Sequence, residues 1–404
     1  MLKKVSVADV ALGMYIHELC GSWMDHPFWK AGFLLQNQAD LQSLTDSAVT
    51  EVWIDTKKGL DLPDHVESEE LEHAAERAEA LLQGAVIGSA TPVALLDEIK
   101  RAWDICERSR KAVIGMFSDV RMGKAIDINS VDGLVDEMAQ SVLRNPSALI
   151  SLVRLKNVDQ YTYMHSVAVC ALMIALARQL ELSEAEVSEA GLAGLMHDIG
   201  KMFISDQILN KPGRLTDEEF AKMRLHPVYG AKILLSNQPT ASALVYDVSL
   251  HHHEKYDGSG YPKKLQGEQI SLFARMAAVC DVYDAITSDR PYKKGWGPAD
   301  SLQRMAQWQG HFDPKVFQAF VRAVGIYPVG SLLRLSSGRL AVVIEQNEQS
   351  LLRPKVKVFF SSKSKMPIEQ TVIDLARSDC QETISAREQA EEWGFRNLDV
   401  LWRE

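Results

Sequence analysis

The sequence predicts a mainly α protein, in which a large helical bundle is flanked by a small N-terminal α/β unit and a small C-terminal β unit. Three observations lead to this prediction. Apolar residues recur with helical spacing through residues 126–325, where strand-like alternation is rare. Short alternating runs bounded by turn residues occur near the two ends of the chain. The length of 404 residues suits two or three domains, and 46% hydrophobic residues suit an ordinary folded core.

The N-terminal unit is expected to span residues 1–60 as a small accessory domain. Val5–Val7 and Glu51–Asp55 have the composition of short strands, and Asp40–Asp46 that of a short helix. An aromatic cluster surrounds His26-Pro27 and consists of Trp23, Phe28, Trp29 and Phe33. We expect this cluster to form a small core rather than a ligand pocket, and a partner surface is the remaining alternative.

Helical segments fill the middle of the chain. Residues 61–125 are expected to form a helical linker, which begins with a strongly acidic stretch at 61–81 and continues as a helix from about Pro92 to Phe117. Within the following domain, residues 126–325, capping-box patterns begin at Ser183 and Thr216. Both patterns precede amphipathic runs, so each predicts the start of a helix.

The pattern of the sequence changes after Pro328. Three runs at 332–335, 340–344 and 355–360 have strand character and are separated by turn residues. We therefore expect residues 326–404 to form the small C-terminal β unit.

Charge and composition exclude several classes of protein. Lysine and arginine total 44 against 54 aspartates and glutamates, and a net charge of -10 disfavours non-specific binding to nucleic acid or to membranes. The five cysteines are scattered and show no metal-binding spacing, so a disulfide framework or cysteine zinc site is not expected. The chain has no apolar run long enough to span a membrane and no secretory signal pattern, which predicts a cytoplasmic location.

Histidines and aspartates form an ordered series in the helical domain. His165 is followed by His197-Asp198, His226, a histidine triplet at 251–253 and finally Asp281, spread over about 120 residues. Imidazole and carboxylate groups are ligands for iron, manganese and zinc. Such short clusters can converge when each lies on a different helix of a bundle. Each cluster alone has a structural explanation, but a packed helical domain has little other use for so many inward polar groups.

Local context supports this interpretation. His197 and Asp198 follow an apolar run that Gly200 interrupts, which places them at a helix C-terminus. His226 precedes Pro227, which favours a helix start at Val228. Asp281 lies in an apolar run, where a carboxylate is expected to be paired or metal-bound.

Six ordered segments combine these residues with their neighbours: YTYMHS at 161–166, HDIGK at 197–201, HP at 226–227, HHE at 252–254, DGSGYP at 257–262 and DVYDAITSDRPYK at 281–293. Through these segments, residues 126–325 resemble the HD-GYP group of the HD superfamily of metal-dependent phosphohydrolases, and the resemblance implies an HD-type helical bundle. Residues 1–60 more weakly resemble the N-terminal domain of unknown function that is often fused to HD-GYP domains.

The resemblance implies a centre of two divalent transition-metal ions, with iron as the first expectation and manganese as the second. The ligands that it implies are His165, His197, Asp198, His226, His252, His253 and Asp281. Asp198 would bridge the ions, the first two histidines and Asp281 would complete one site, and the other three histidines would complete the second. Family members with three metals have a glutamate where this chain has Tyr161, which argues for two ions here.

The reaction implied by the resemblance is hydrolysis of cyclic di-GMP to pGpG and onward to GMP. Two cations about 3.5–4 Å apart clamp a phosphodiester and lower the pKa of a bridging water, whose hydroxide attacks phosphorus. Lys201, Arg290 and Lys293 would contact phosphate, and Tyr261 would lie near the substrate. Asp198 and Lys201 would carry the catalytic roles. Glu254 and Asp284 would orient ligands, whereas His251, outside the motif, would be structural.

Two alternatives remain at this stage. The chain could be a catalytically weak receptor for cyclic di-GMP, or a phosphodiesterase for another cyclic dinucleotide, because phosphate contacts do not read bases. Intact ligands and Lys201 argue against the receptor. The partners expected are cyclic di-GMP, diguanylate cyclase (GGDEF) domains and a second copy of the chain.

Overall fold

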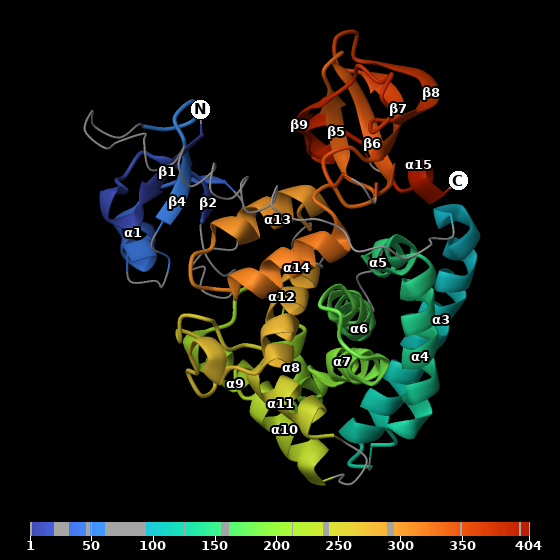
Figure 1. Ribbon diagram of the computed structural model, residues 1–404. Helices are drawn as coiled ribbons and strands as arrows, with labels where there is room; N and C mark the ends of the chain where they lie inside the picture. The colour runs from blue at the N-terminus through green and yellow to red at the C-terminus, as the bar shows by residue number, and fades with distance from the viewer. Residues whose placement is uncertain are drawn as a thin grey trace. The chain divides into compact units, whose positions relative to one another are not determined.

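A computed structural model confirms a mainly α fold with small sheets near both ends of the chain (Figure 1). It describes residues 2–19, 32–45, 49, 51–60, 94–124, 126–154, 161–211, 213–236, 242–288, 295–347, 350–395 and 397–403. The chain divides into two compact units. The first comprises Met1–Ala78 and Lys211–Thr216, and the second comprises Glu79–Asn210 and Asp217–Glu404.

The N-terminal unit contains a four-stranded sheet of order β1-β4-β2-β3, in which neighbouring strands pair antiparallel. Its elements are β1 Leu2–Ser6, η1 Val7–Asp9, β2 Tyr15–Leu19, β3 Phe33–Leu34, α1 Gln38–Thr45 and β4 Glu51–Asp55. Its core includes Ile16, Val52 and Ile54, each at most 1% exposed. The strand expected at 51–55 is confirmed. Trp23, Phe28, Trp29 and the acidic stretch 61–81 lie outside the described residues.

The second unit begins with a bundle of α-helices, with short 3-10 turns between α7 and α8 and between α11 and α12. Its elements are α3 Leu95–Arg121, α4 Asn129–Arg144, α5 Pro146–Arg154, α6 Tyr161–Gln179, α7 Glu184–Met196, η4 Ile199–Phe203, α8 Asp206–Leu209, α9 Asp217–Met223, α10 His226–Ser236, α11 Ala243–His251, η5 Gly267–Gln269, α12 Leu272–Thr287, α13 Pro298–Gln307 and α14 Pro314–Val324.

Helix α6 lies inside this bundle and packs against α3, α4, α5, α7, α12 and α14 (Figure 1). Nearly all of its side chains from Met164 to Ala177 are buried, because this stretch is apolar on every face. His165 is therefore held at 2% exposure within a helix that has no solvent-facing side at that level. A polar residue in such a place needs partners.

Helix α7 begins with the predicted capping box, in which Ser183 and Glu186 exchange hydrogen bonds. It ends at Met196, so His197 and Asp198 follow its C-terminus as expected. The prediction for His226 is wrong by two residues, since α10 begins at His226 rather than at Val228. Proline is tolerated in the first turn of a helix, so Pro227 does not delay its start.

Gly200 allows η4 and α10 to touch. A Cβ at this position would lie 1.9 Å from the His226 carbonyl oxygen and 2.4 Å from the Gly230 nitrogen. Both of those atoms are backbone, so no side-chain movement could make room. This close approach brings the start of α10, and with it His226, beside the residues that end α7.

The C-terminal β unit is an antiparallel sheet of order β8-β7-β6-β5-β9. Its elements are β5 Leu332–Leu335, β6 Arg339–Glu345, β7 Lys355–Ser361, β8 Met366–Asp374, β9 Ile384–Arg387, η6 Ala390–Trp393 and α15 Val400–Arg403. The three expected strands are confirmed as β5, β6 and β7. The sheet is joined to the bundle where the Arg154 guanidinium of α5 donates a hydrogen bond to the Val329 carbonyl.

Among the described residues, no helix combines the length and the apolar character that a membrane span requires.

Candidate metal centre

Seven side chains, six of them buried and His253 partly buried, converge inside the bundle from five places in the chain. His165 comes from α6, His226 begins α10, and Asp281 lies on α12, while the two remaining pairs follow the ends of α7 and α11. Three groups have ligand atoms within 4.8 Å of one another: His226 with His252 and His253, His165 with His197 and Asp198, and His197 with His252 and Asp281. Together they comprise the seven predicted ligands and no other residue of the described chain.

Asp198 lies between two sets of histidines. Its Oδ2 atom is 3.5 Å from His165 Nε2 and 3.3 Å from His197 Nε2. Its Oδ1 atom is 3.3 Å from His226 Nε2 and 3.8 Å from His252 Nε2. One carboxylate thus offers one oxygen to each set, which is the arrangement a bridging ligand needs.

Asp281 also faces both sides of the cluster. Its Oδ1 atom is 3.0 Å from His165 Nε2, and its Oδ2 atom is 3.7 Å from His253 Nδ1. The resemblance implied that Asp281 would share one metal site with His165 and His197 only. In the structure its second oxygen reaches toward the other set.

Hydrogen bonds behind four of the imidazoles fix their orientation. His165 Nδ1 donates to Asp284 at 2.6 Å, and His197 Nδ1 donates to the Gly194 carbonyl at 2.7 Å. His226 Nδ1 donates to the Met223 carbonyl at 2.7 Å, and His252 Nδ1 to the Ser249 carbonyl at 3.0 Å. A neutral imidazole that donates through Nδ1 carries a lone pair on Nε2. When these imidazoles are neutral, all four lone pairs face the cluster, as metal ligation requires.

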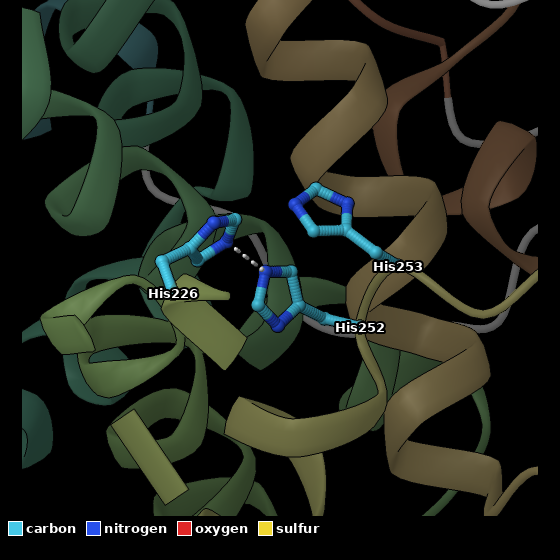
Figure 2. Close-up of side chains that lie close together, drawn as sticks. All are labelled: His226, His252 and His253. Carbon is cyan, nitrogen blue, oxygen red and sulfur yellow. Dashed lines mark hydrogen bonds between the residues drawn. The ribbon is translucent and has the colours of Figure 1, made fainter. Parts of the chain in front are cut away.

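The contact between His226 and His252 follows from this orientation. Figure 2 shows their Nε2 atoms facing each other, 3.3 Å apart, with His253 beside them. Because both Nδ1 atoms donate elsewhere, neither Nε2 carries the proton that a hydrogen bond across this contact would need. Burial, together with the nearby His197 and His226, lowers the pKa of His252 to about 3, so His252 is neutral at pH 7.

The donor set fits divalent cations. Asp198 Oδ1 and His197 Nε2 are buried and make no hydrogen bond with described residues. Burial opposes ionisation of Asp198, but Lys201 and His197 outweigh it and hold the pKa of this carboxyl well below its usual range. Burial likewise opposes ionisation of Asp281, yet His165 and its neighbours keep its pKa well below normal. Two buried carboxylates and facing imidazole lone pairs are the hard and borderline donors that such ions prefer.

The loop that follows the histidine pair is fixed by Glu254. Its carboxylate accepts hydrogen bonds from the backbone N–H groups of Lys263 at 2.6 Å and Leu265 at 3.1 Å. The expectation that Glu254 orients a metal ligand is corrected, because among the described residues its carboxylate bonds the backbone of the loop. Asp284 does bond a ligand histidine, as expected.

Tyr261 lies against the metal centre. Its ring centroid is 4.8 Å from that of His253, and the Arg224 guanidinium carbon lies 4.4 Å from the Tyr261 centroid. A backbone hydrogen bond from Tyr261 N–H to the His253 carbonyl, at 3.2 Å, ties the loop to the histidine pair. Tyr261 is 9% exposed.

The other predicted contacts differ in how far the structure describes them. The Lys201 ammonium forms an ion pair with Asp198 Oδ2, so it lies at the cluster. Arg290 and Lys293 lie outside the described residues, as does the side chain of Tyr161. Nothing in the sequence singles out Arg224, one of two basic residues in a helical stretch that also contains Lys222.

His251 points away from the ligand groups. Its Nδ1 donates to Asp247 at 2.8 Å, and Asp247 also accepts from Ser271, whose hydroxyl caps the start of α12. This network gives His251 a structural environment, in keeping with its omission from the predicted ligands.

Comparison with known proteins identifies related sequences. A family model described as an HD domain matches residues 138–316, and a domain of unknown function (DUF3391) matches residues 2–131. A cyclic di-GMP phosphodiesterase of Pseudomonas aeruginosa is 62% identical over 405 residues, which cover 100% of this chain and 96% of that protein.

Other relatives match a smaller part of this chain. A cyclic di-GMP phosphodiesterase response regulator of Xanthomonas campestris is 44% identical over 36% of this chain and 39% of its own length. A 3′3′-cGAMP-specific phosphodiesterase of Vibrio cholerae is 40% identical over 35% of this chain and 28% of its own length.

Proposed function

Because this chain belongs to the HD-GYP family of HD-domain proteins, we propose that it is a metal-dependent phosphodiesterase that hydrolyses cyclic di-GMP to pGpG and onward to GMP. The similarity to the Pseudomonas aeruginosa enzyme spans the whole of this chain. It therefore includes the flanking units as well as the helical domain.

One observation carries the proposal. The carboxylate of Asp198 has one oxygen 3.3 Å from His197 Nε2 and the other 3.3 Å from His226 Nε2. This geometry supports a two-ion centre bridged by Asp198. His165, His197 and Asp281 would hold one ion, and His226, His252 and His253 the other. The second oxygen of Asp281, which faces His253, would be free to approach the second ion.

Bound divalent transition-metal ions would supply Lewis acidity to a phosphodiester and activate water at neutral pH. The chain's own groups would supply orientation and charge. Lys201 lies at the bridging carboxylate, where its ammonium would stabilise negative charge that develops on the phosphoryl oxygens. Tyr261 would line the substrate side of His253. Arg290 and Lys293 would contact phosphate. We assign the catalytic roles to Asp198 and Lys201.

Iron is the ion we favour, and manganese is the second choice. Mixed imidazole and carboxylate sites accept both, since affinity order alone does not select between them. The division of the chain that we propose is an accessory domain at 1–60, a helical linker at 61–125, the catalytic domain at 126–325 and a β unit at 326–404. Our proposal includes a cytoplasmic location and, as partners, GGDEF domains and a second copy of the chain.

A second substrate class is supported by one finding. The relative from Vibrio cholerae that is named as specific for 3′3′-cGAMP is 40% identical over 144 residues. A metal centre of this kind would contact phosphate, which does not by itself distinguish guanine from adenine. We keep cyclic di-GMP as the proposed substrate, because the relative that matches this chain over its whole length is named as a cyclic di-GMP phosphodiesterase.

The test is incubation of anaerobically purified, iron- or manganese-loaded protein with cyclic di-GMP, 3′3′-cGAMP and cyclic di-AMP. Chromatography of the products should show pGpG and then GMP from cyclic di-GMP, at a higher kcat/KM than for the other two substrates. Tight binding of cyclic di-GMP without pGpG from metal-replete, reduced protein would identify a receptor instead. Preferential cleavage of 3′3′-cGAMP would move the proposal to that substrate.

A further inference from the structure

Arg224 forms the outer layer of a stack that begins at the metal centre. The residue follows α9 and lies two positions before His226. Its guanidinium carbon is 4.4 Å from the Tyr261 ring centroid and 5.9 Å from that of Phe220. The Tyr261 ring is in turn 4.8 Å from the ring of His253. A single aromatic ring therefore separates the guanidinium from a proposed metal ligand.

The guanidinium donors of Arg224 are unclaimed among the residues that the structure describes. Within the described part of the chain, no carboxylate or carbonyl accepts a bond from its guanidinium, and its contacts are the two aromatic rings. Arginines elsewhere in the bundle are paired: Arg144 with Glu98 at 2.7 Å, and Arg178 with Glu184 at 2.7 Å. An arginine held by stacking, with its donors unoccupied, is available to an anion.

The chemistry of the site calls for such a group. The chain carries a net charge of -10, so an anionic substrate needs local positive charge. A guanidinium stacked on an aromatic face loses little further entropy when it binds, and its planar fork matches phosphate oxygens. A cyclic dinucleotide has two phosphodiesters, and only one can lie at the metal ligands. The position of Arg224, one ring beyond His253, suits the other.

We propose that Arg224 is a substrate-binding residue, which holds the non-scissile phosphate of the cyclic dinucleotide at the edge of the metal centre. This assignment rests on the proposed phosphodiesterase function. In this role, the Arg224 guanidinium would favour a dinucleotide with two phosphates over a substrate with one. The competing role is purely structural, in which Arg224 only holds Tyr261 in place.

The experiment compares manganese-loaded wild type with Arg224→Gln, Arg224→Lys and the control Lys222→Gln. Lys222 is exposed on α9, so its substitution removes the same charge two residues away. Steady-state hydrolysis is measured with cyclic di-GMP, with 3′3′-cGAMP, and with bis(4-nitrophenyl) phosphate, which has a single phosphodiester. Metal content and Tm are measured for every variant.

We expect Arg224→Gln to raise KM for the cyclic dinucleotides about tenfold or more, the loss typical of one charge-assisted contact. Its kcat should change less than about twofold, since binding lost equally from ground and transition states changes KM alone. Arg224→Lys should recover part of the loss. Lys222→Gln, metal content and KM for bis(4-nitrophenyl) phosphate should match wild type.

Several outcomes would overturn the assignment. Equal KM values for Arg224→Gln and Lys222→Gln would show that Arg224 does not touch substrate. Equal losses in Arg224→Lys and Arg224→Gln, or a lower metal content, would indicate the structural role. A raised KM for bis(4-nitrophenyl) phosphate would place Arg224 at the scissile phosphate. If wild type cleaves neither dinucleotide, the proposed function itself fails, and this assignment fails with it.

Discussion

Asp198 is the residue on which both histidine sets depend, because each of its carboxylate oxygens faces one set. Asp198→Ala is expected to lower the metal content well below that of wild type and to abolish turnover. The substitution leaves facing imidazole lone pairs without the negative charge that holds cations between them. Elemental analysis and product chromatography on the same preparation check both parts.

His251 provides the matched control, since it belongs to the same histidine triplet but bonds Asp247 instead of facing the cluster. His251→Ala is expected to keep wild-type metal content and turnover. If His251→Ala loses metal while His253→Ala does not, the ligand assignment within the triplet is wrong by at least one residue.

Tyr161 bears on the number of ions. In HD-GYP family members that hold three metal ions, the position one helical turn before His165 is a carboxylate. In this chain it is a tyrosine. We expect about two transition-metal ions per chain by elemental analysis, and no change in Tyr161→Phe. A content near three, unchanged in that variant, would mean that another carboxylate such as Asp159 serves as a ligand.

The phosphate contacts should separate binding from turnover. Arg290→Ala and Lys293→Ala are expected to weaken substrate binding by about tenfold to a hundredfold, from roughly 1.5–3 kcal/mol per charge-assisted contact, with normal metal content. Lys201→Ala should lower kcat more than it raises KM if Lys201 meets charge that develops in the transition state. Normal kcat in Lys201→Ala would remove it from the catalytic roles.

At the level of elements, the sequence predicted most of what positions the site. The strand at 51–55, the capping box at Ser183 and the helix end at His197 are all confirmed. These features follow from local chemistry, namely alternation, capping hydrogen bonds and a glycine break. The strands β8 and β9 were not predicted. Most residues of β8 are exposed, and neither strand has a clear alternation of apolar and polar residues. The spacing of apolar residues therefore did not indicate strands in these two segments.

The contents of the site were predictable to different degrees. The seven proposed ligands could be selected from their order along the chain, and the structure brings them together. The partner of Glu254 and the position of Arg224 could not, because each depends on a contact made by folding. Glu254 accepts bonds from residues nine and eleven positions away, and Arg224 meets Tyr261 across a helix and a loop.

Gly200 gives the sharpest prediction at this scale. In Gly200→Ala, the new Cβ would meet backbone atoms of α10 at 1.9 and 2.4 Å, so η4 and α10 must separate and carry His226 away from Asp198. We expect metal loss and a destabilisation of about 1–3 kcal/mol or more. Denaturant unfolding and elemental analysis measure the two effects.

Gly133 in α4 is the control for this substitution, because a Cβ there meets nothing within 4 Å. Gly133→Ala should stabilise the protein by about 0.5–1 kcal/mol, as alanine restricts the unfolded chain, and should leave the metal content unchanged. Wild-type stability and metal content in Gly200→Ala would refute the close-approach argument.

On the scale of the whole molecule, the largest unit combines the helical bundle with the C-terminal sheet. Arg154, at the end of α5, donates to the Val329 carbonyl at 2.9 Å, just before β5. The adjacent Gly330 leaves room for this guanidinium, since a Cβ there would lie 2.4 Å from Arg154 Nη2. Burial lowers the pKa of Arg154, while nearby Tyr283 on α12, the helix that carries the proposed ligand Asp281, acts in the opposite direction. The same arginine thus lies next to both the sheet and α12.

Arg154→Met keeps the length of the side chain and removes the guanidinium, so the C-terminal sheet should lose about 1.5–3 kcal/mol of its coupling to the bundle. Hydrogen exchange read by mass spectrometry should show faster exchange in β5 and β6 while α6 keeps its protection. Arg377→Met removes an exposed arginine of the same sheet region, whose partner Asp379 is 68% exposed, and should change exchange little. Equal loss of protection in α6 and β5 would mean that the sheet and the bundle unfold as one cooperative unit. Unchanged exchange in both would mean that Arg154 does not anchor the sheet at all.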